Sequence, residues 1–265
     1  MTEMLLTDVD DRGVARVTLN RADVHNAFNE ELIAALTETF QTLGEDDGVR
    51  VIVLRGAGPS FSAGADVNWM RQAAGYGEEQ NVADAMHLST MLHTLNTVPK
   101  PTIALVHGAA MGGGVGLVAC CDIALAVRSA KFALSEVRLG LTPATISPYV
   151  IAKIGEGQAR RLFLTAERFD GVTAEKIGLL HITVGSVEDL DVTAEGLIDQ
   201  LLVGAPGAQA AAKDLIFTVK GREVTLPLRE ETAERIAVRR ASPEGREGLA
   251  AFLDKRRPAW VAGSD

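Results

Sequence analysis

Two segments rich in small residues follow apolar strand-like runs and lead into helix starts. The first is GPSFSAGADVNWM, residues 58–70, and the second is HGAAMGGGVGL, residues 107–117. Small residues at such a turn allow backbone angles that other residues avoid and let a second group approach closely. A helix start presents unpaired N–H groups and the positive end of the helix dipole. Two such turns in one domain could converge on a single oxygen and stabilise negative charge as it develops there.

The glycines also have a purely structural interpretation. A run of glycines permits close packing of a helix on a sheet, and this role stays open for residues 112–114 taken alone. Glycine costs about 1 kcal/mol per helix-interior position relative to alanine, so four near one helix start need a structural or functional reason. Neither segment ends in Gly-Lys-Ser/Thr, which excludes a phosphate loop, and GGGVGL lacks the G-x-G-x-x-G spacing of a dinucleotide site.

The elements that must position these turns alternate along the chain. Residues 13–21 alternate apolar and polar types like a half-buried strand, and residues 49–56 are typical of a fully buried strand. Between them, after the capping candidate Asn29, apolar residues recur at three- and four-residue steps and predict a helix. These residues are Leu32, Ile33, Leu36, Phe40 and Leu43. Further strands from Thr102 and Asp122, with a helix around 82–96 and another after the glycines, predict α/β architecture with largely parallel pairing.

The C-terminal part has a different character. After about residue 160, HITV at 181–184 is the main strand signal. Residues 205–255 are typical of successive helices with charged faces, interrupted at residues 221–227 and at Ser242-Pro243. We expect this tail to pack partly on its own core and partly on a neighbouring subunit. The prediction is a core over residues 1–200 and a C-terminal helical region over residues 201–265.

Composition bounds the function. A chain of 265 residues suits one main domain with an appended element, and 47% hydrophobic with 23% charged residues is ordinary for a globular protein. We find no basic N-terminal region with a long apolar run and no 18-residue uncharged apolar stretch, so we expect a cytoplasmic protein without membrane contact. A formal net charge of −9 argues against broad nucleic-acid or anionic-membrane binding.

No pattern in the sequence indicates a metal or a redox cofactor. The only cysteines, Cys120 and Cys121, are adjacent in an apolar helix, which predicts buried structural thiols. The five histidines show no metal-ligand spacing. We therefore expect no metal site and no cofactor.

Six motifs, in order, resemble those of the crotonase, or enoyl-CoA hydratase/isomerase, superfamily. They are NRADVHNAFN (20–29), FSAGADV (61–67), KPTIALVHGAAMGGGVGL (100–117), CDIALA (121–126), FALSEVRLGLTP (132–143) and FLDKRRP (252–258), and together they span nearly the whole chain. The resemblance implies an α/β fold with a core of ββα spiral turns and a C-terminal helical trimerisation region, assembled as a homotrimer or hexamer. The implied substrate is an acyl-CoA thioester, with coenzyme A as part of the substrate.

The same resemblance implies the residues of the site. The backbone amides of Ala65 and Gly113 map onto an oxyanion hole, which suits the enolate-like charge of a thioester during proton movement at its α-carbon. The resemblance implies further substrate contacts. The backbone at Ala27 and Ala63 would meet the adenine of CoA, and Lys255 would meet a CoA phosphate on a neighbouring subunit. The residues implied near the thioester are Asp66, Val67, Asn68 and Gly112. Trp69 is assigned to the acyl pocket or to the core, and Asp66 is also expected to cap the helix that follows it.

Many hydratases of this superfamily use two glutamates, whose positions map onto Gly116 and Glu136, and only the second is present. An apolar environment would raise the pKa of Glu136 and suit it to act as base and acid in turn. A solvated carboxylate after Ser135 is the alternative from the residues alone. Three functions remain open: hydration by Glu136 alone, isomerisation of an enoyl-CoA, and CoA binding without activity.

The motif wording narrows this choice. The segments SAGADVNWM, GGGVGLVACCD, SEVRLGLTPATISPYV and LTAERFDG resemble bacterial methylglutaconyl-CoA hydratases, whose substrate carries a second carboxylate. We predict a lyase that hydrates such an enoyl-CoA. Glycine at position 116 would remove charge repulsion toward this substrate and leave room for it. RNA-binding members are the alternative of another class, and the acidic balance without aromatic-basic interleaving argues against it.

Overall fold

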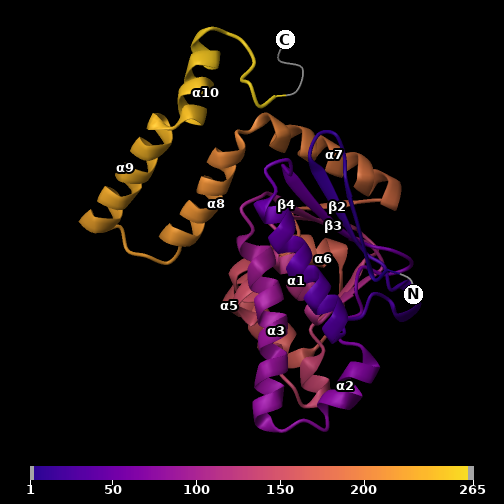
Figure 1. The fold of residues 1–265 in the computed structure, drawn as a ribbon. Helices are drawn as coiled ribbons and strands as arrows, with labels where there is room; N and C mark the ends of the chain where they lie inside the picture. The colour runs from indigo at the N-terminus through magenta and orange to yellow at the C-terminus, as the bar shows by residue number, and fades with distance from the viewer. Residues whose placement is uncertain (1–2, 262–265) are drawn as a thin grey trace.

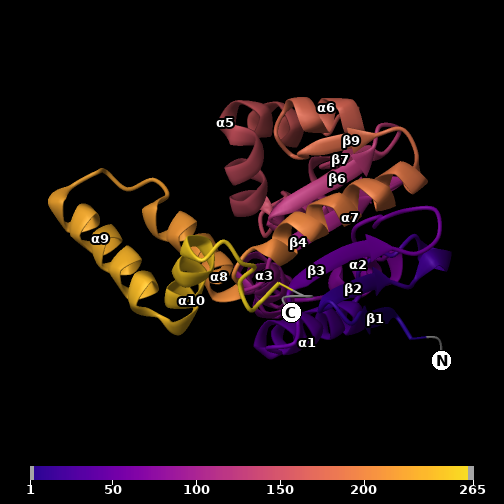
Figure 2. The same ribbon diagram turned by 90° about the horizontal axis from the view of Figure 1, so that it is seen from above.

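The computed structural model describes residues 3–261, which form two sheets and ten α-helices with short 3₁₀ segments (Figures 1 and 2). The large sheet has the strand order β1 (Leu5–Val9), β2 (Val14–Leu19), β3 (Val51–Gly56), β4 (Thr102–Val106), β6 (Ile123–Val127) and β9 (Ile182–Val184). Strands β1 and β2 pair antiparallel, and the other pairs are parallel. The predicted α/β class with largely parallel pairing is therefore confirmed.

A second, smaller sheet joins β5 (Ala109–Met111), β7 (Lys131–Ala133) and β8 (Phe169–Asp170). The chain alternates between the two sheets, since β4 is followed by β5 and helix α4 (Gly113–Cys120), and β6 by β7 and helix α5 (Ser147–Thr165). This alternation forms the expected ββα spiral. It also places the start of α4 beside the small sheet.

Several short strands were not predicted. Strand β1 lies at the edge of the large sheet, and β5, β7 and β8 have only two or three residues each. After residue 160 the described chain has the two-residue β8 and β9, which lies within the predicted HITV, so the expectation of little strand there is confirmed. A three-residue strand carries too little periodicity to be recognised and exists only because a partner strand lies beside it.

Helix α1 (Glu30–Glu45) begins where its sequence predicts. The Asn29 side chain accepts a hydrogen bond from Leu32 N–H at 3.0 Å and caps the helix. All five apolar residues of the predicted stripe are buried. Helix α1 packs along α3 (Glu78–Thr97), which begins four residues before the expected range (Figure 1).

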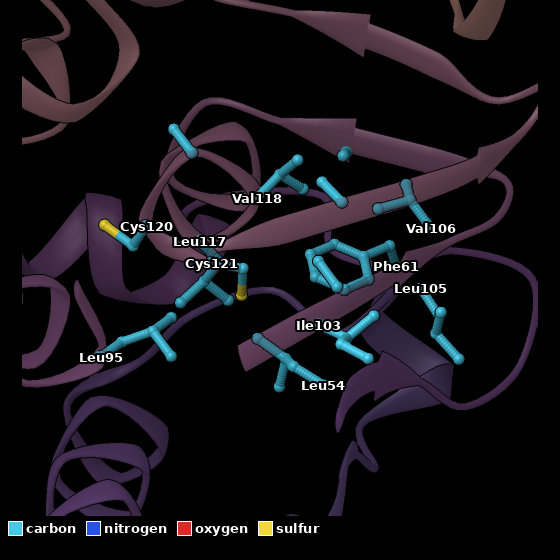
Figure 3. Close-up of a cluster of buried hydrophobic side chains, with 14 of the residues drawn as sticks. Leu54, Phe61, Leu95, Ile103, Leu105, Val106, Leu117, Val118, Cys120 and Cys121 are labelled. Atoms are coloured by element: carbon cyan, nitrogen blue, oxygen red, sulfur yellow. The ribbon is translucent and has the colours of Figure 1, made fainter. Parts of the chain in front are cut away.

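The hydrophobic core lies between the large sheet and the helices that cover it. Figure 3 shows a part of it in which Phe61 lies among side chains of β3, β4 and α4. Cys120 and Cys121 are buried in the same core without a disulfide, as predicted. Burial raises the pKa of Cys121 to about 12, so this thiol stays protonated and unreactive at neutral pH.

Four helices make up the C-terminal part: α7 (Val187–Val203), α8 (Pro206–Val219), α9 (Leu226–Ala241) and α10 (Pro243–Leu253). Helix α7 crosses the large sheet, whereas α8, α9 and α10 project away from it in both views (Figures 1 and 2). Ser242 caps α10 by accepting from Gly245 N–H at 3.0 Å, at the predicted break. No helix among the described residues is long and apolar enough to cross a membrane.

Two polar contacts anchor the projecting helices. The Lys213 ammonium of α8 lies 2.9 Å from Oδ2 of Asp122, which also accepts from the backbone and the hydroxyl of Thr102 at the start of β4. The Arg50 guanidinium donates to the carbonyl of Gly204 at 2.8 Å, at the junction of α7 and α8. Burial lowers the pKa of Arg50 from its usual value.

Candidate active site

The two glycine-rich turns lie side by side. Ser62 and Ala110 pair as an isolated parallel bridge, in which Ser62 N–H donates to Ala109 O and Met111 N–H donates to Ser62 O, each at 2.9 Å. A Cβ on Gly64, where φ is +86°, would lie 2.8 Å from the carbonyl oxygen of Met111. Only glycine permits both this backbone angle and this approach, so the small residues of the two turns bring them together.

The amide of Ala65 is free because of how Phe28 pairs with it. Phe28 N–H donates to Gly64 O at 2.6 Å, and Asp66 N–H donates to Phe28 O at 2.8 Å, which makes a parallel bridge between Phe28 and Ala65. In a parallel pair these bonds go to the residues on either side of Ala65, so the N–H of Ala65 faces away from Phe28. Within residues 3–261 this N–H has no protein acceptor.

The amide of Gly113 is free because it opens helix α4. Gly112, with φ +48° and ψ −115°, precedes the helix, and the first N–H groups of a helix lack intrahelical partners. No acceptor in the described part of the chain receives the Gly113 N–H. A Cβ on Gly64 would lie 3.8 Å from Gly113 N, so the second free amide stands next to the first turn. Two neighbouring turns that each leave a backbone N–H without a protein acceptor make Ala65 and Gly113 candidates for a two-amide oxyanion hole.

Glu136 lies over Gly112. It opens the short 3₁₀ segment η2 (Glu136–Leu139), and its Oε1 is 3.0 Å from the place of a Cβ on Gly112. Its Oε2 is buried and has no hydrogen-bond partner among the described residues. Burial raises the pKa of this carboxyl above its usual value. A partly desolvated carboxyl with one unpaired oxygen, next to the glycine that precedes the free Gly113 amide, is a candidate general base and acid.

The space beside Gly116 is filled. A Cβ on Gly116 would overlap Cγ2 of Ile146 and lie 3.4 Å from Cδ2 of Leu92. Ile146 is 2% exposed and directly precedes helix α5. The expectation that glycine at position 116 leaves room for substrate was therefore wrong, because an aliphatic side chain from another segment occupies that volume.

Asp66, at the end of the first turn, forms a largely buried ion pair with Arg21. It caps helix α2 (Val67–Ala73) by accepting from Asn68 N–H at 2.8 Å, as predicted, and its Oδ2 lies 2.9 Å from Arg21. Arg21 also donates to the carbonyl of Ala27. Burial acts to raise the pKa of Asp66, but the bonds from the Asn68 amide and from Arg21 outweigh it and hold this pKa below its usual value.

The remaining substrate-contact candidates lie around this pair. A cleft of about 260 Å³ is lined by Arg21, Asn29, Glu30, Glu31, Asp66, Asn68, Trp69 and Gln72. Ala63, Val67 and Asn68 are exposed, whereas Ala27 is buried, with its N–H bonded to Val24 O and its carbonyl to Arg21. The Trp69 indole N–H donates to Asp84 of α3 at 3.1 Å, and the ring packs against the core. Trp69 therefore ties α2 to α3 at the rim of this cleft.

Lys255 is not brought to the site of its own chain. It follows helix α10, which lies at the opposite end of the molecule from α2 in Figure 1. The side chain is exposed. No group of three or more histidine, cysteine, aspartate or glutamate side chains that could hold a metal occurs in the described residues.

Three contributors to the site were not found from the sequence: Phe28, Arg21 and Ile146. Phe28 and Arg21 stand within a motif that the resemblance singled out, but nothing in their types marks them apart from their neighbours. Ile146 is one aliphatic residue among many. Only its contact with Gly116, 30 residues earlier in the chain, reveals its place.

Comparisons with known proteins match nearly the whole chain. Residues 10–263 match the family model described as enoyl-CoA hydratase/isomerase. The crystal structure of an enoyl-CoA hydratase from Shewanella pealeana is 43% identical, with a TM-score of 0.94 over 97% of this chain and 96% of that chain. The structure of AtuE from Pseudomonas aeruginosa is 38% identical, with a TM-score of 0.94 over 98% of this chain and 100% of that chain. The 1,2-epoxyphenylacetyl-CoA isomerase of Escherichia coli K12 is 32% identical over 98% of this chain and 99% of that protein.

Proposed function

The chain belongs to the enoyl-CoA hydratase/isomerase family, and we propose that it catalyses the addition of water across the double bond of an α,β-unsaturated acyl-CoA thioester. One observation carries this proposal. The buried, unpaired Oε2 of Glu136 accompanies two free backbone amides, those of Ala65 and Gly113. The amides suit a thioester oxygen that becomes negative, and the carboxylate suits a proton that must be taken and returned.

The steps balance with a single carboxylate. Glu136 removes a proton from water as the water oxygen bonds to the β-carbon, and the electron pair of the double bond moves toward the thioester oxygen. The amides of Ala65 and Gly113 stabilise that oxyanion. The protonated Glu136 then delivers its proton to the α-carbon, and the carbonyl re-forms. This sequence is redox-neutral, so the proposal assigns no cofactor beyond the CoA of the substrate.

We also propose that the acyl chain is 3-methylglutaconyl, which carries a second carboxylate. The apolar wall of Ile146 and Leu92 at position 116 supports this, because it keeps a second protein carboxylate away from an anionic substrate. Arg71 and Arg138 are exposed and are candidates to meet the distal carboxylate; Arg71 bonds the Asn68 side chain at 3.0 Å.

Isomerisation of a 3-enoyl-CoA is the second candidate function. The same apolar wall favours it, because moving a proton between two carbons needs one carboxylate and no bound water. Incubation with a 3-enoyl-CoA and with a 2-enoyl-CoA, each followed by product analysis, separates the two reactions.

The proposal includes assembly as a trimer or hexamer through residues 201–265, with the site-bearing core in residues 1–200. Its support is a set of large apolar side chains exposed on α8 to α10 and their connections: Ile216, Phe217, Val224, Leu226, Ile236, Val238, Leu249, Phe252 and Leu253. Lys255 would then reach the CoA of a neighbouring subunit. A cytoplasmic location is part of the same proposal.

The decisive experiment is a spectrophotometric hydration assay on crotonyl-CoA and 3-methylglutaconyl-CoA. Wild type is compared with Glu136→Gln and with Glu188→Gln, an exposed carboxylate at the start of α7 that serves as the control. Loss of hydration in Glu136→Gln alone supports the assignment. Hydration by the wild type on neither substrate would overturn the proposed function.

A further inference from the structure

Phe28 contacts both turns of the candidate oxyanion hole, and it does so with different parts of the residue. Its backbone N–H and C=O bond Gly64 and Asp66, which flank Ala65. Its ring lies against Gly113: a Cβ there would be 2.9 Å from Cδ2 and still closer to Cε2. One residue therefore connects the two free amides.

The ring of Phe28 has little room to move away from its neighbours. Phe28 is 1% exposed and belongs to the hydrophobic core, where side chains are packed at the density of a crystal. A phenyl ring is also planar and stiff, unlike the end of a flexible chain. The ring therefore sets how near helix α4 comes to the strand-like segment that carries Ala65. Its burial also keeps it from touching substrate.

We propose that Phe28 is a positioning residue that sets the spacing between the Ala65 and Gly113 amides. This inference rests on the proposed function, in which both amides bind one thioester oxygen. The proposal also explains why residues 112 and 113 are glycine for different reasons. Residue 112 needs glycine for its left-handed backbone, whereas residue 113 is helical and needs glycine because the ring of Phe28 leaves no space for a Cβ.

The alternative is that the Ser62–Ala110 bridge alone sets the spacing and that Phe28 only fills the core. The two explanations differ in what a side-chain change does. Phe28→Leu keeps the backbone bonds to Gly64 and Asp66 and removes the ring from Gly113. If the ring positions the Gly113 amide, Phe28→Leu loses transition-state stabilisation. If the ring only fills the core, Phe28→Leu loses only folding stability.

The experiment compares wild type, Phe28→Leu, Gly113→Ala, the double variant, and Phe40→Leu. Phe40 is a fully buried phenylalanine of α1 that does not approach Gly64, Gly112 or Gly113, so its variant controls for lost core volume. Phe28→Met retains more volume and replaces Phe28→Leu if that variant does not fold. Circular dichroism establishes folding first.

The first readout is the ultraviolet absorption of bound cinnamoyl-CoA, whose band moves to longer wavelength when its thioester oxygen accepts strong hydrogen bonds. The second is kcat and KM for crotonyl-CoA. We expect Phe28→Leu to reduce the red shift and to lower kcat roughly tenfold, less than the loss of a whole oxyanion donor, with KM changed by less than about threefold. Phe40→Leu should change neither quantity.

The double variant gives the sharpest outcome. Gly113→Ala alone forces the new methyl group against the ring, and Phe28→Leu removes that ring. We expect the double variant to match or exceed Gly113→Ala in kcat, whereas independent effects would multiply.

Three outcomes separate the hypotheses. An undiminished red shift and kcat in Phe28→Leu, or multiplied losses in the double variant, would overturn the role of Phe28. A wild type that shifts the cinnamoyl-CoA band without hydrating any enoyl-CoA would overturn the proposed hydratase but leave this inference standing. No shift in the wild type would remove the oxyanion assignment and this inference together.

Discussion

Ile146 stands where a side chain at position 116 would project. A Cβ on Gly116 would lie 3.1 Å from Cβ of Ile146 and overlap its Cγ2. Gly112 is the N-cap of helix α4 and has non-helical backbone angles, whereas Gly116 lies inside the helix. Glu136 lies over the first of them and Ile146 over the second. One carboxylate and one aliphatic side chain thus lie over the start of the same helix.

This packing predicts the result of restoring a glutamate. Gly116→Glu should destabilise the fold by about 1–3 kcal/mol, because it overfills a packed site and buries a charge. Adding Ile146→Ala should recover much of this loss. Urea denaturation of both variants and of Ile146→Ala alone measures the effect, and equal destabilisation of the single and double variants would contradict it.

The same pair tests substrate preference. In Gly116→Glu/Ile146→Ala, the new carboxylate should lower kcat/KM for 3-methylglutaconyl-CoA more than for crotonyl-CoA, because only the former carries a second negative charge. Ile146→Ala is the matched control for lost volume. An equal change on both substrates would show that charge at position 116 does not select the acyl chain.

Substitution of Glu136 should have a large kinetic effect. Glu136→Gln keeps the shape of the side chain but cannot take up a proton, so kcat should fall by about 10²–10⁴-fold. The Gln variant should still bind acyl-CoA, as measured by calorimetry, since both backbone amides remain. Retained activity would remove Glu136 from the mechanism.

The pH dependence follows from burial of the same group. Burial raises the pKa of Glu136, so kcat/KM should rise with pH through that elevated pKa as the base becomes charged. Stability has the opposite sign. The folded state holds this proton more tightly than the unfolded chain, so the contribution is full below the unfolded pKa and is lost as pH rises through the folded pKa. Glu136→Gln should therefore gain stability relative to wild type as pH increases, which thermal denaturation at several pH values checks.

The buried pair of Arg21 and Asp66 predicts a structural effect. Arg21→Ala leaves the Asp66 carboxylate without its charged partner, and both side chains are largely buried, so we expect a loss of about 3 kcal/mol. Arg160→Ala is the control, because its pair with Glu156 is exposed and should contribute less than about 1 kcal/mol. Similar losses in the two variants would contradict the role assigned to burial.

Much of the site was predictable because its signals are local. The strand-to-helix turns at 58–70 and 107–117, the Asn29 and Asp66 caps, and the stripe on α1 each depend on neighbouring residues. Short strands such as β5 and β7 were missed, because their pairing partners lie elsewhere in the chain.

The sequence by itself determined the α/β class, because turn chemistry and periodicity act over a few residues. Its motifs carried the family resemblance, and that resemblance implied the candidate groups Ala65, Gly113 and Glu136. Only the tertiary structure decided that the ring of Phe28 lies on Gly113 and that Ile146 fills the space at Gly116. These pairs are 85 and 30 residues apart in the chain, since 113 − 28 = 85 and 146 − 116 = 30. Their contact depends on how the helices pack on the two sheets, and close packing makes that outcome specific to each side chain's shape.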